Sequence, residues 1–128
     1  MNIFNTYLKY INETILILLE DNNIVLENDN LLEKIVVEVP KDKKFGDLST
    51  NAALVLSSTF KTKPLDVAKK LKLKFENHHD FYDVSIVNPG FINFTLQEDV
   101  WQKLLFNLLE TGKWKYEQFG KNNNLNLS

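Results

Sequence analysis

Apolar side chains recur at spacings of three and four over the first 21 residues, the pattern of a helix that buries one stripe. Asn2 is a suitable N-cap residue, and the polar residues 21–23 would end the helix. The pattern therefore predicts a helix from Asn2 to about Asp21. Its buried stripe would hold Phe4, Leu8, Ile11, Ile15 and Leu18.

Two strands are predicted after this helix. Ile24 to Leu26 is a short apolar run between asparagine-rich segments, and Lys34 to Val39 alternates apolar and polar positions. Alternate residues of the second run would share one face, because side chains alternate across a strand. Pro40 cannot donate to a strand ladder, so the second strand would end there.

Two central helices follow. Asp47 and Ser49 are both good N-cap residues, and the apolar run after them predicts a helix that ends near Phe60. Pro64 suits the first position of the next helix, which would run to about Phe75 with its apolar residues inward.

A last helix is predicted after residue 96. The acidic pair Glu98 and Asp99 would oppose the helix dipole at its start, and Gly112 is a natural C-cap. Between these ends, Trp101 and several leucines recur at helical spacing.

Residues 84–96 are the most informative stretch. Two runs of alternating apolar and polar residues flank Pro89 and Gly90, which predicts an antiparallel hairpin. Pro89 would occupy the first central position of a type II turn, and Gly90 would supply the positive φ that the second position requires. The strand after the turn would direct these side chains into the core: Ile92, Phe94 and Leu96.

The opposite side of this hairpin combines an aromatic ring, Phe91, with the amides of Asn88 and Asn93. A splayed-out RNA base needs this combination, a ring on which to stack and polar groups for its edge. The alternative is structural: Phe91 folds over the edge of the core and the asparagines serve the turn. A strict two-residue turn would also place Val84 and Ile86 on this side, whereas a longer loop or a bulge would move them.

The predicted order of elements is α-β-β-α-α-β-β-α. It indicates an α+β fold of two layers, with a mostly antiparallel sheet of three to four strands and helices on one face. The other face would be open and would carry Asn88, Phe91 and Asn93.

Composition narrows the possible functions. The chain has 128 residues, 44% of them hydrophobic and 25% charged, which is typical of one globular domain. Cysteine is absent, so disulfides, thiolate metal sites and cysteine nucleophiles are excluded. No apolar run is long enough to span a bilayer and no signal peptide is evident, so we expect a cytoplasmic location and no membrane partner. The net charge of −2 means that any nucleic-acid contact would be local.

Catalytic motifs are missing from the sequence. It holds no phosphate-binding loop, dinucleotide fingerprint, zinc-protease motif, serine-hydrolase motif or His-x-Gly-His signature. We therefore expect no catalytic residues and no cofactor in this chain. His78 and His79 are adjacent in a polar loop without the further ligands that a metal needs, so we also expect no metal site.

Three segments together resemble the N-terminal additional domain of arginyl-tRNA synthetases. Residues 37–40 with 45–53 are similar to the family's strand, loop and Gly-Asp-x-(Ser/Ala)-(Thr/Ser)-Asn helix entry. Residues 64–68 are similar to its Pro-x-x-(Ile/Val)-Ala helix, and residues 88–94 to its (Gly/Asn)-Pro-Gly-Phe-(Ile/Leu)-Asn-(Phe/Leu) hairpin. The order and spacing of the three agree over roughly residues 1–120.

The resemblance implies contact with the elbow of tRNA(Arg), where the strand pair holds a D-loop nucleotide, and no role for DNA. Phe91 would stack on the base, and Asn88 and Asn93 would bond its edge or the sugar. Loop lysines could meet phosphate nearby, although a solvated loop explains them equally well: Lys41, Lys43 and Lys44.

The remaining residues of these motifs would be structural. The resemblance implies that Gly46 is a turn glycine, Asp47 a helix cap and Asn51 a loop clamp. Pro89 and Gly90 would form the hairpin turn.

In the family, a class I catalytic domain follows that binds arginine and ATP with magnesium. We expect residues 1–113 to be the tRNA-binding domain and residues 114–128 a linker toward that domain. The chain would be an expressed fragment or, as a less favoured alternative, a truncated natural product, and it would be inactive alone. The parent enzyme would join arginine to tRNA(Arg) for translation. The alternative is a protein-interaction or architectural module that uses the Trp101 helix and the aromatic tail.

Overall fold

The computed structural model describes residues 3–27 and 29–110. Asn2–Gln97 form one compact unit, and helix α4 (Glu98–Glu110) belongs to a second, so each is described by itself. Three predictions fall outside the described residues: the N-cap at Asn2, the C-cap at Gly112 and the linker at 114–128. The predicted domain boundary after residue 113 lies there as well.

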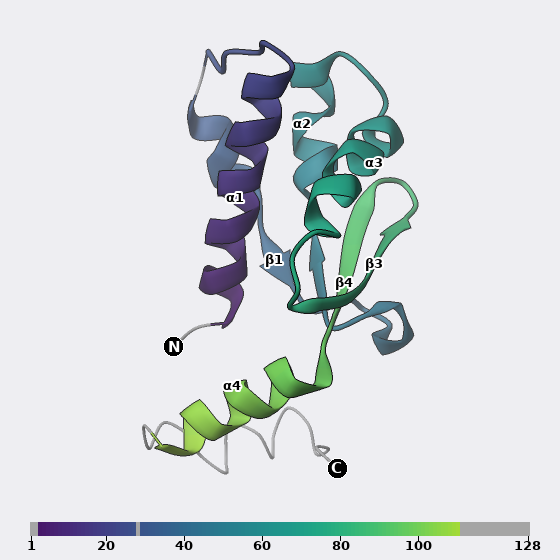
Figure 1. The fold of residues 1–128 in the computed structure, drawn as a ribbon. Helices are drawn as coiled ribbons and strands as arrows, with labels where there is room; N and C mark the ends of the chain where they lie inside the picture. Colours follow the sequence, from purple (N-terminus) through teal and green to yellow (C-terminus); the bar gives the residue numbers. More distant parts are fainter. Residues whose placement is uncertain (1–2, 28, 111–128) are drawn as a thin grey trace. The chain divides into compact units, whose positions relative to one another are not determined.

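A four-stranded antiparallel sheet forms one layer of the first unit (Figure 1). Its strands are β1 (Val37–Glu38), β2 (Leu48–Thr50), β3 (Phe81–Val87) and β4 (Phe91–Leu96), in the spatial order β1-β2-β4-β3. Strand β4 is therefore central, with β2 on one side and β3 on the other.

Three helices pack against the sheet: α1 (Ile3–Asp21), α2 (Ala52–Phe60) and α3 (Pro64–Phe75). Two short 3₁₀ helices, η1 (Asp29–Lys34) and η2 (Lys43–Phe45), flank β1 along the chain. The predicted α+β class and the order α-β-β-α-α-β-β-α are confirmed.

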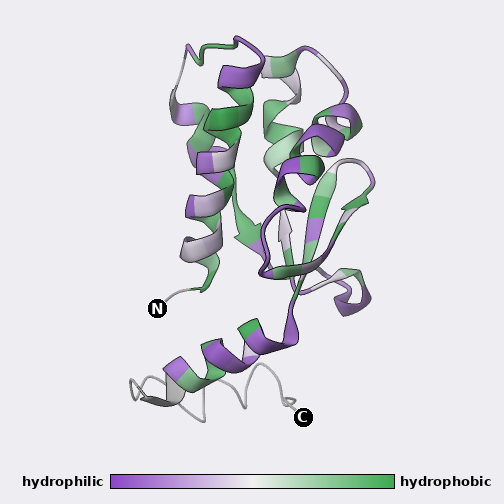
Figure 2. Ribbon diagram, viewed as in Figure 1, coloured by the Kyte–Doolittle hydropathy of each residue, from purple (hydrophilic) through white to green (hydrophobic). Residues whose placement is uncertain are grey.

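The core lies between the helices and one face of the sheet. Phe94 of β4 meets Phe75 of α3 edge to face, with ring centroids 5.3 Å apart, and Phe81 of β3 with centroids 4.6 Å apart. Ala52 and Ala53 are fully buried, so α2 packs closely against its neighbours. Figure 2 shows hydrophobic residues along these helices and strands, and a hydrophilic loop between α3 and β3.

Of the two strands predicted after α1, one is absent and the other is shorter than predicted. Residues 24–26 form no strand, because the Ile24 amide donates to the Leu19 carbonyl at 2.9 Å and closes the end of α1. Asn23 adopts φ +56° there, the left-handed conformation typical of such a helix end. The predicted strand 34–39 is reduced to Val37–Glu38, because Lys34 ends η1 and residues 34 and 36 bond to a side chain instead of a strand.

The segment after Gly46 is also different from the prediction. Leu48–Thr50 form β2 rather than the first turn of a helix, and α2 begins at Ala52. Asp47 is therefore not a helix cap. Its amide donates to the Phe94 carbonyl at 2.7 Å and its carboxylate accepts from the Leu96 amide at 2.8 Å, so it extends the pairing of β2 with β4.

The hairpin is confirmed, but its turn is not of type II. Val87 pairs with Phe91, which leaves three residues in the turn, and the Asn88-Pro89 peptide bond is cis. Pro89 thus occupies the second central position, as in type VI turns, and Gly90 has no positive φ. The longer turn shifts the register, so that Val84 pairs with Phe94 and faces the core.

Helix α4 carries Glu98 and Asp99 in its first turn, as expected from the dipole. Its exposed large side chains include Trp101, Leu105 and Phe106. Among the described residues, no helix combines the length and apolar character needed to cross a membrane.

Candidate functional site

The face of the sheet opposite the core holds the residues that the sequence singled out. Ile92 and Phe94 of β4 point to the helices and are buried, so Phe91 and Asn93 point to the other side. Asn93 lies opposite Ser49 of β2 and Ser85 of β3. The polar side chains of Ser49, Asn93 and Ser85 therefore lie in a row across the centre of this face, beside the ring of Phe91.

A pocket of about 330 Å³ opens on this face. The sheet contributes Ser49, Val87, Phe91 and Asn93 to its lining. The chain from the end of β1 to η2 forms the facing wall with Glu38, Val39, Pro40, Lys41, Asp42 and Phe45. The result is a mixed surface of two aromatic rings, aliphatic groups and a few polar groups, which is typical of a site for a planar organic ligand.

The amide of Asn93 is held in one orientation inside this pocket. The Ser49 hydroxyl donates to the Asn93 Oδ1 atom at 2.8 Å, across neighbouring strands. Asn93 is only 4% exposed and Ser49 7%. The expectation that both asparagines stand open on the sheet is therefore wrong for Asn93, which is recessed at the base of the pocket.

The other predicted contact residues differ in position. Phe91 is half-buried in the pocket wall, and Lys41 also lines the pocket. Asn88 is exposed in the hairpin turn and is not among the pocket-lining residues. The structure thus brings Phe91, Asn93 and Lys41 together, and leaves Asn88 at the tip of the turn.

The lysines of η2 also lie outside the lining of the pocket. Lys43 and Lys44 are exposed, and Lys44 pairs with Asp42 at 3.7 Å. The Lys44 Nζ atom also lies 5.5 Å from the centroid of the Phe45 ring. Their geometry suits phosphate contacts at the rim better than contacts to a base.

Sequence reasoning missed seven of the ten residues that line this pocket: Glu38, Val39, Pro40, Asp42, Phe45, Ser49 and Val87. Phe45 is 43% exposed and supplies a second aromatic ring to the lining of the pocket. No specific signal in the sequence pointed to Phe45, because single exposed apolar side chains are common on protein surfaces. Ser49 carried no such signal, since its partner Asn93 is 44 residues away.

The residues around the pocket are fixed by their backbone contacts. Gly46 has φ +128°, and a Cβ atom on it would lie 2.8 Å from the Phe94 carbonyl oxygen, so only glycine fits. Asn51 accepts from the Val36 amide at 2.8 Å and donates to the Lys34 carbonyl at 3.1 Å. These contacts tie the chain on either side of the pocket wall to β4 and to the start of α2.

Gly90 is required for a different reason from the one predicted. A Cβ atom on Gly90 would lie 2.8 Å from the Pro64 Cβ atom and 3.4 Å from the Leu54 side chain. The hairpin tip therefore packs directly on the first residue of α3, and the glycine permits this close approach.

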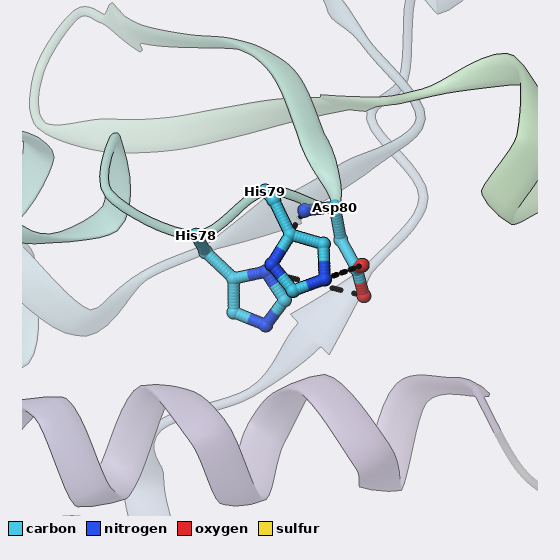
Figure 3. Close-up of side chains that lie close together, drawn as sticks. All are labelled: His78, His79 and Asp80. Atoms are coloured by element: carbon cyan, nitrogen blue, oxygen red, sulfur yellow. Dashed lines mark hydrogen bonds and ion pairs between the residues drawn. The ribbon is translucent and has the colours of Figure 1, made fainter.

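A second cluster of chemically active side chains lies before β3. His78, His79 and Asp80 place their ligand atoms within 4.8 Å of one another (Figure 3). The Asp80 carboxylate accepts from the Tyr7 hydroxyl at 2.9 Å, and the His78 Nδ1 atom accepts from the Asp80 amide at 3.0 Å. These contacts make the cluster a brace between α1 and the loop. The expectation that it binds no metal stays a prediction.

Burial affects two tyrosines near this brace. It raises the pKa of Tyr7 well above its ordinary value, and the hydrogen bond to Asp80 adds to this effect. Burial also raises the pKa of Tyr10, whose ring meets that of His78 at 4.5 Å between centroids. Both phenols remain neutral at physiological pH, so they act here as packing and hydrogen-bonding groups.

A larger hollow of about 680 Å³ lies elsewhere, between the segment after α1 and the end of α2. Its lining includes Asn23, Val25, Lys34 and Phe60. Val25 is 86% exposed there, and the hollow contains no recessed polar group comparable with Asn93 among the described residues. Volume alone therefore does not single out a candidate site, and the smaller pocket is the candidate because rings and a fixed amide converge there.

Comparisons with known proteins agree on one family. Residues 5–96 match the family model described as the arginyl tRNA synthetase N terminal domain. The arginine–tRNA ligase of Ehrlichia ruminantium (strain Gardel) is 36% identical over 107 residues, which cover 83% of this chain and 19% of that protein. That of Ehrlichia chaffeensis is 40% identical over 105 residues, covering 82% and 18%.

A third relative extends the comparison beyond that genus. The arginine–tRNA ligase of Rhodopseudomonas palustris (strain HaA2) is 47% identical over 81 residues, which cover 63% of this chain and 14% of that protein. The chain thus spans about a fifth or less of the length of these relatives. The match of the family model over residues 5–96 shows that the chain belongs to the family of arginyl-tRNA synthetase N-terminal domains.

Proposed function

We propose that this chain is the tRNA-recognition domain of an arginine–tRNA ligase, and that its sheet pocket holds an unpaired nucleotide of the D-loop at the elbow of tRNA(Arg). The observation that carries the proposal is the presence of Phe91 and Asn93 in one pocket of about 330 Å³. An aromatic face and a fixed amide are the groups with which proteins hold a splayed-out base.

Phe91 provides the stacking surface and Phe45 closes the opposite side. Asn93 meets the edge of the base, while Asn88 at the turn reaches the sugar or the phosphate that follows. Lys41, at the pocket, and Lys43 and Lys44, at its rim, attract the backbone. With a net charge of −2 on the chain, this local group of lysines supplies the electrostatic contribution to binding.

The parent enzyme would carry a class I catalytic domain in cis. That domain would activate arginine with ATP and magnesium and transfer it to tRNA(Arg) in the cytoplasm. The role of the present chain is to place the tRNA, and none of its described residues takes part in the chemistry.

Chemical-shift mapping of the isotope-labelled chain with a tRNA(Arg) transcript tests the location of the site. The expected result is perturbation of residues 88–93 and of the chain around Phe45. A response confined to Trp101 and its neighbours on α4 would instead favour the protein-interaction module, for which the exposed Trp101 and Phe106 of α4 are the supporting observation.

Affinity measurements test the mechanism. In the full-length ligase, Phe91→Ala should weaken tRNA(Arg) binding by roughly 5- to 150-fold, because one base–aromatic stack is lost. The matched control is Tyr82→Ala, which removes an aromatic side chain of β3 that is 73% exposed and lies outside the pocket lining. Equal affinity of the wild type and Phe91→Ala in a filter-binding titration would rule out stacking at this position.

A further inference from the structure

A lysine-rich segment joins α2 to α3 and continues along α3. Residues 61–74 contain six lysines and one acidic residue, which is a net charge of +5 in a chain whose total is −2. The two lysines nearest the end of α3 are neutralised by ion pairs with Glu76 and Asp21, each at 2.9 Å. At the other end, Lys61 and Lys63 are exposed, and neither forms an ion pair within the described part of the chain. The positive charge of the turn between the two helices is therefore not neutralised by an ion pair.

The backbone conformation at position 61 favours a residue other than lysine. Lys61 has φ +55° and ψ +42°, the left-handed conformation. Its amide donates to the Ser58 carbonyl, and the Thr62 amide donates to the Ser57 carbonyl, both at 3.1 Å, so α2 ends in a Schellman motif. The helix dipole favours a cation at this end of α2. The left-handed conformation, however, is strained for a residue with a side chain, and glycine is the usual residue there.

The local structure does not require lysine at position 63 either. Lys63 is the N-cap of α3, a position where serine, threonine, aspartate or asparagine normally accepts from the first free amides of the helix. The Lys63 side chain makes no such bond, and its charge lies at the end where the helix dipole disfavours cations. One turn thus holds two lysines where stability favours other residues, and such departures from local preference are typical of functional positions.

This turn adjoins the tip of the β3–β4 hairpin. A Cβ atom on Gly90 would lie 2.8 Å from the Pro64 Cβ atom, so the tip packs against the residue that directly follows Lys63. Asn88 is exposed in the same tip. An RNA strand that leaves the sheet pocket over the hairpin would therefore reach the turn between the helices, whereas Lys70 lies about 9 Å further along α3.

We propose that the turn between α2 and α3 is a second RNA contact, in which Lys61 and Lys63 bind phosphates of the tRNA strand that continues from the nucleotide in the pocket. This inference rests on the proposed function. Lysine is a compact charge that binds phosphate without reading a base. The turn therefore orients the strand and strengthens binding independently of the RNA sequence, from the helical layer instead of the open sheet face.

The test compares two charge-matched variants of the 128-residue chain in NMR titrations with a tRNA(Arg) transcript at several salt concentrations. Lys61→Gly with Lys63→Ser removes two charges and places the locally favoured residue at each position. Lys69→Gln with Lys70→Gln removes the same charge from exposed positions further along α3. The first double variant should bind more weakly and reduce the slope of log K against log salt by about 1.4–1.8, for two phosphate contacts. The second should keep the slope of the wild type.

Thermal melts of the same variants separate binding from folding. Lys61→Gly with Lys63→Ser should have a higher melting temperature than the wild type, because both local preferences are then satisfied. A lower melting temperature would overturn the inference that the fold does not need these two lysines. Lys61→Arg with Lys63→Arg keeps both charges and should retain the salt dependence of the wild type.

Two binding results would overturn the proposal. An unchanged slope in Lys61→Gly with Lys63→Ser would mean that the turn does not meet RNA and is free for an acidic protein partner. An equal loss of slope in both double variants would mean that only the overall charge matters. Failure of the proposed function has a different signature, because residues 88–93 of the wild type would then show no response to the transcript, and both proposals would fall.

Discussion

The two faces of strand β4 differ in what they contribute to the molecule. Ile92 and Phe94 are at most 1% exposed against the helices, whereas the opposite side presents a half-buried ring and a recessed amide. The first face is apolar and closely packed. The second contains polar groups that a core does not require. This difference indicates that the helix face maintains the fold, and it leaves the open face for the binding role proposed above.

The largest expected effect lies on the helix face. Phe94→Ala should lower the free energy of unfolding by about 3–5 kcal/mol, because it leaves a cavity between Phe75 and Phe81. Phe91→Ala, on the opposite face of the same strand, should cost only about 1–2 kcal/mol, since its ring is half-buried. Urea denaturation measures the free energy of unfolding of both variants. Equal losses would contradict the idea that the helix face of β4 contributes more to stability than the open face.

A substitution at Gly46 tests whether the loop that lines the pocket depends on its close contact with β4. Gly46→Ala should destabilise the chain by about 2–3 kcal/mol, because its φ of +128° is strained for alanine and the new Cβ atom would meet the Phe94 carbonyl. Lys44→Ala on the same loop is the control and should be nearly neutral. If Gly46→Ala has the same melting temperature as the wild type, the loop accommodates the new Cβ atom without loss of stability.

The hydrogen bond from Tyr7 of α1 to Asp80, in the loop before β3, predicts that the stability of the fold depends on pH. The raised pKa of Tyr7 means that the folded state keeps its proton when the unfolded state begins to lose it. Stability should therefore fall as the pH rises above about 10, the ordinary pKa of tyrosine. Tyr7→Phe should reduce this slope and, at neutral pH, cost about 1 kcal/mol for the hydrogen bond to Asp80. An identical alkaline slope in Tyr7→Phe, measured by denaturation from pH 8 to 11, would assign the effect to other groups.

The polar pair of the open face should be nearly neutral for stability when both members are removed. Ser49→Ala combined with Asn93→Val should change the free energy of unfolding by less than about 1 kcal/mol, since no polar group is left unpaired. The same double variant should weaken tRNA(Arg) binding, because it removes the Asn93 amide from the lining of the pocket. A loss of several kcal/mol in the double variant would show instead that the pair is needed for folding.

The smallest effect is expected at the rim. Lys43→Ala should weaken tRNA(Arg) binding equally for all loop sequences and reduce the slope of log K against log salt by about 0.7–1. Lys70→Ala, an exposed lysine of α3, should leave the slope unchanged. Filter binding at several salt concentrations distinguishes Lys43→Ala from Lys70→Ala. Equal slopes for the wild type and both variants would exclude Lys43 from the phosphate contact.

The elements with a long, regular apolar period could be predicted from the sequence. Helix α3 has the bounds expected from Pro64 and the spacing of its apolar residues, and α1 ends at the predicted Asp21. Strand β2 could not be predicted, because its three residues look like a helix start, and only pairing with β4 across more than 40 residues makes them a strand. The length of β1 was also overestimated. The Asn51 side chain accepts from the Val36 amide and donates to the Lys34 carbonyl, so these residues do not pair with a strand.

The candidate site was predictable only in part. Phe91 and Asn93 stood out as an aromatic ring and an amide on one side of a hairpin, and the structure places both in one pocket. Phe45 and Ser49 join them through sheet register and loop position, which no local pattern encodes. The roles of Asn88, Phe91 and Asn93 in holding a nucleotide stay predictions.

Gly90 rests on Pro64, the first residue of α3, so the tip of the hairpin is anchored to the helical layer one residue before Phe91. A platform for a base at Phe91, as proposed above, would therefore be preorganised, with little backbone freedom to lose when RNA arrives. A ligand that meets such a rigid surface forfeits less conformational entropy, so a small contact area can still discriminate between nucleotides.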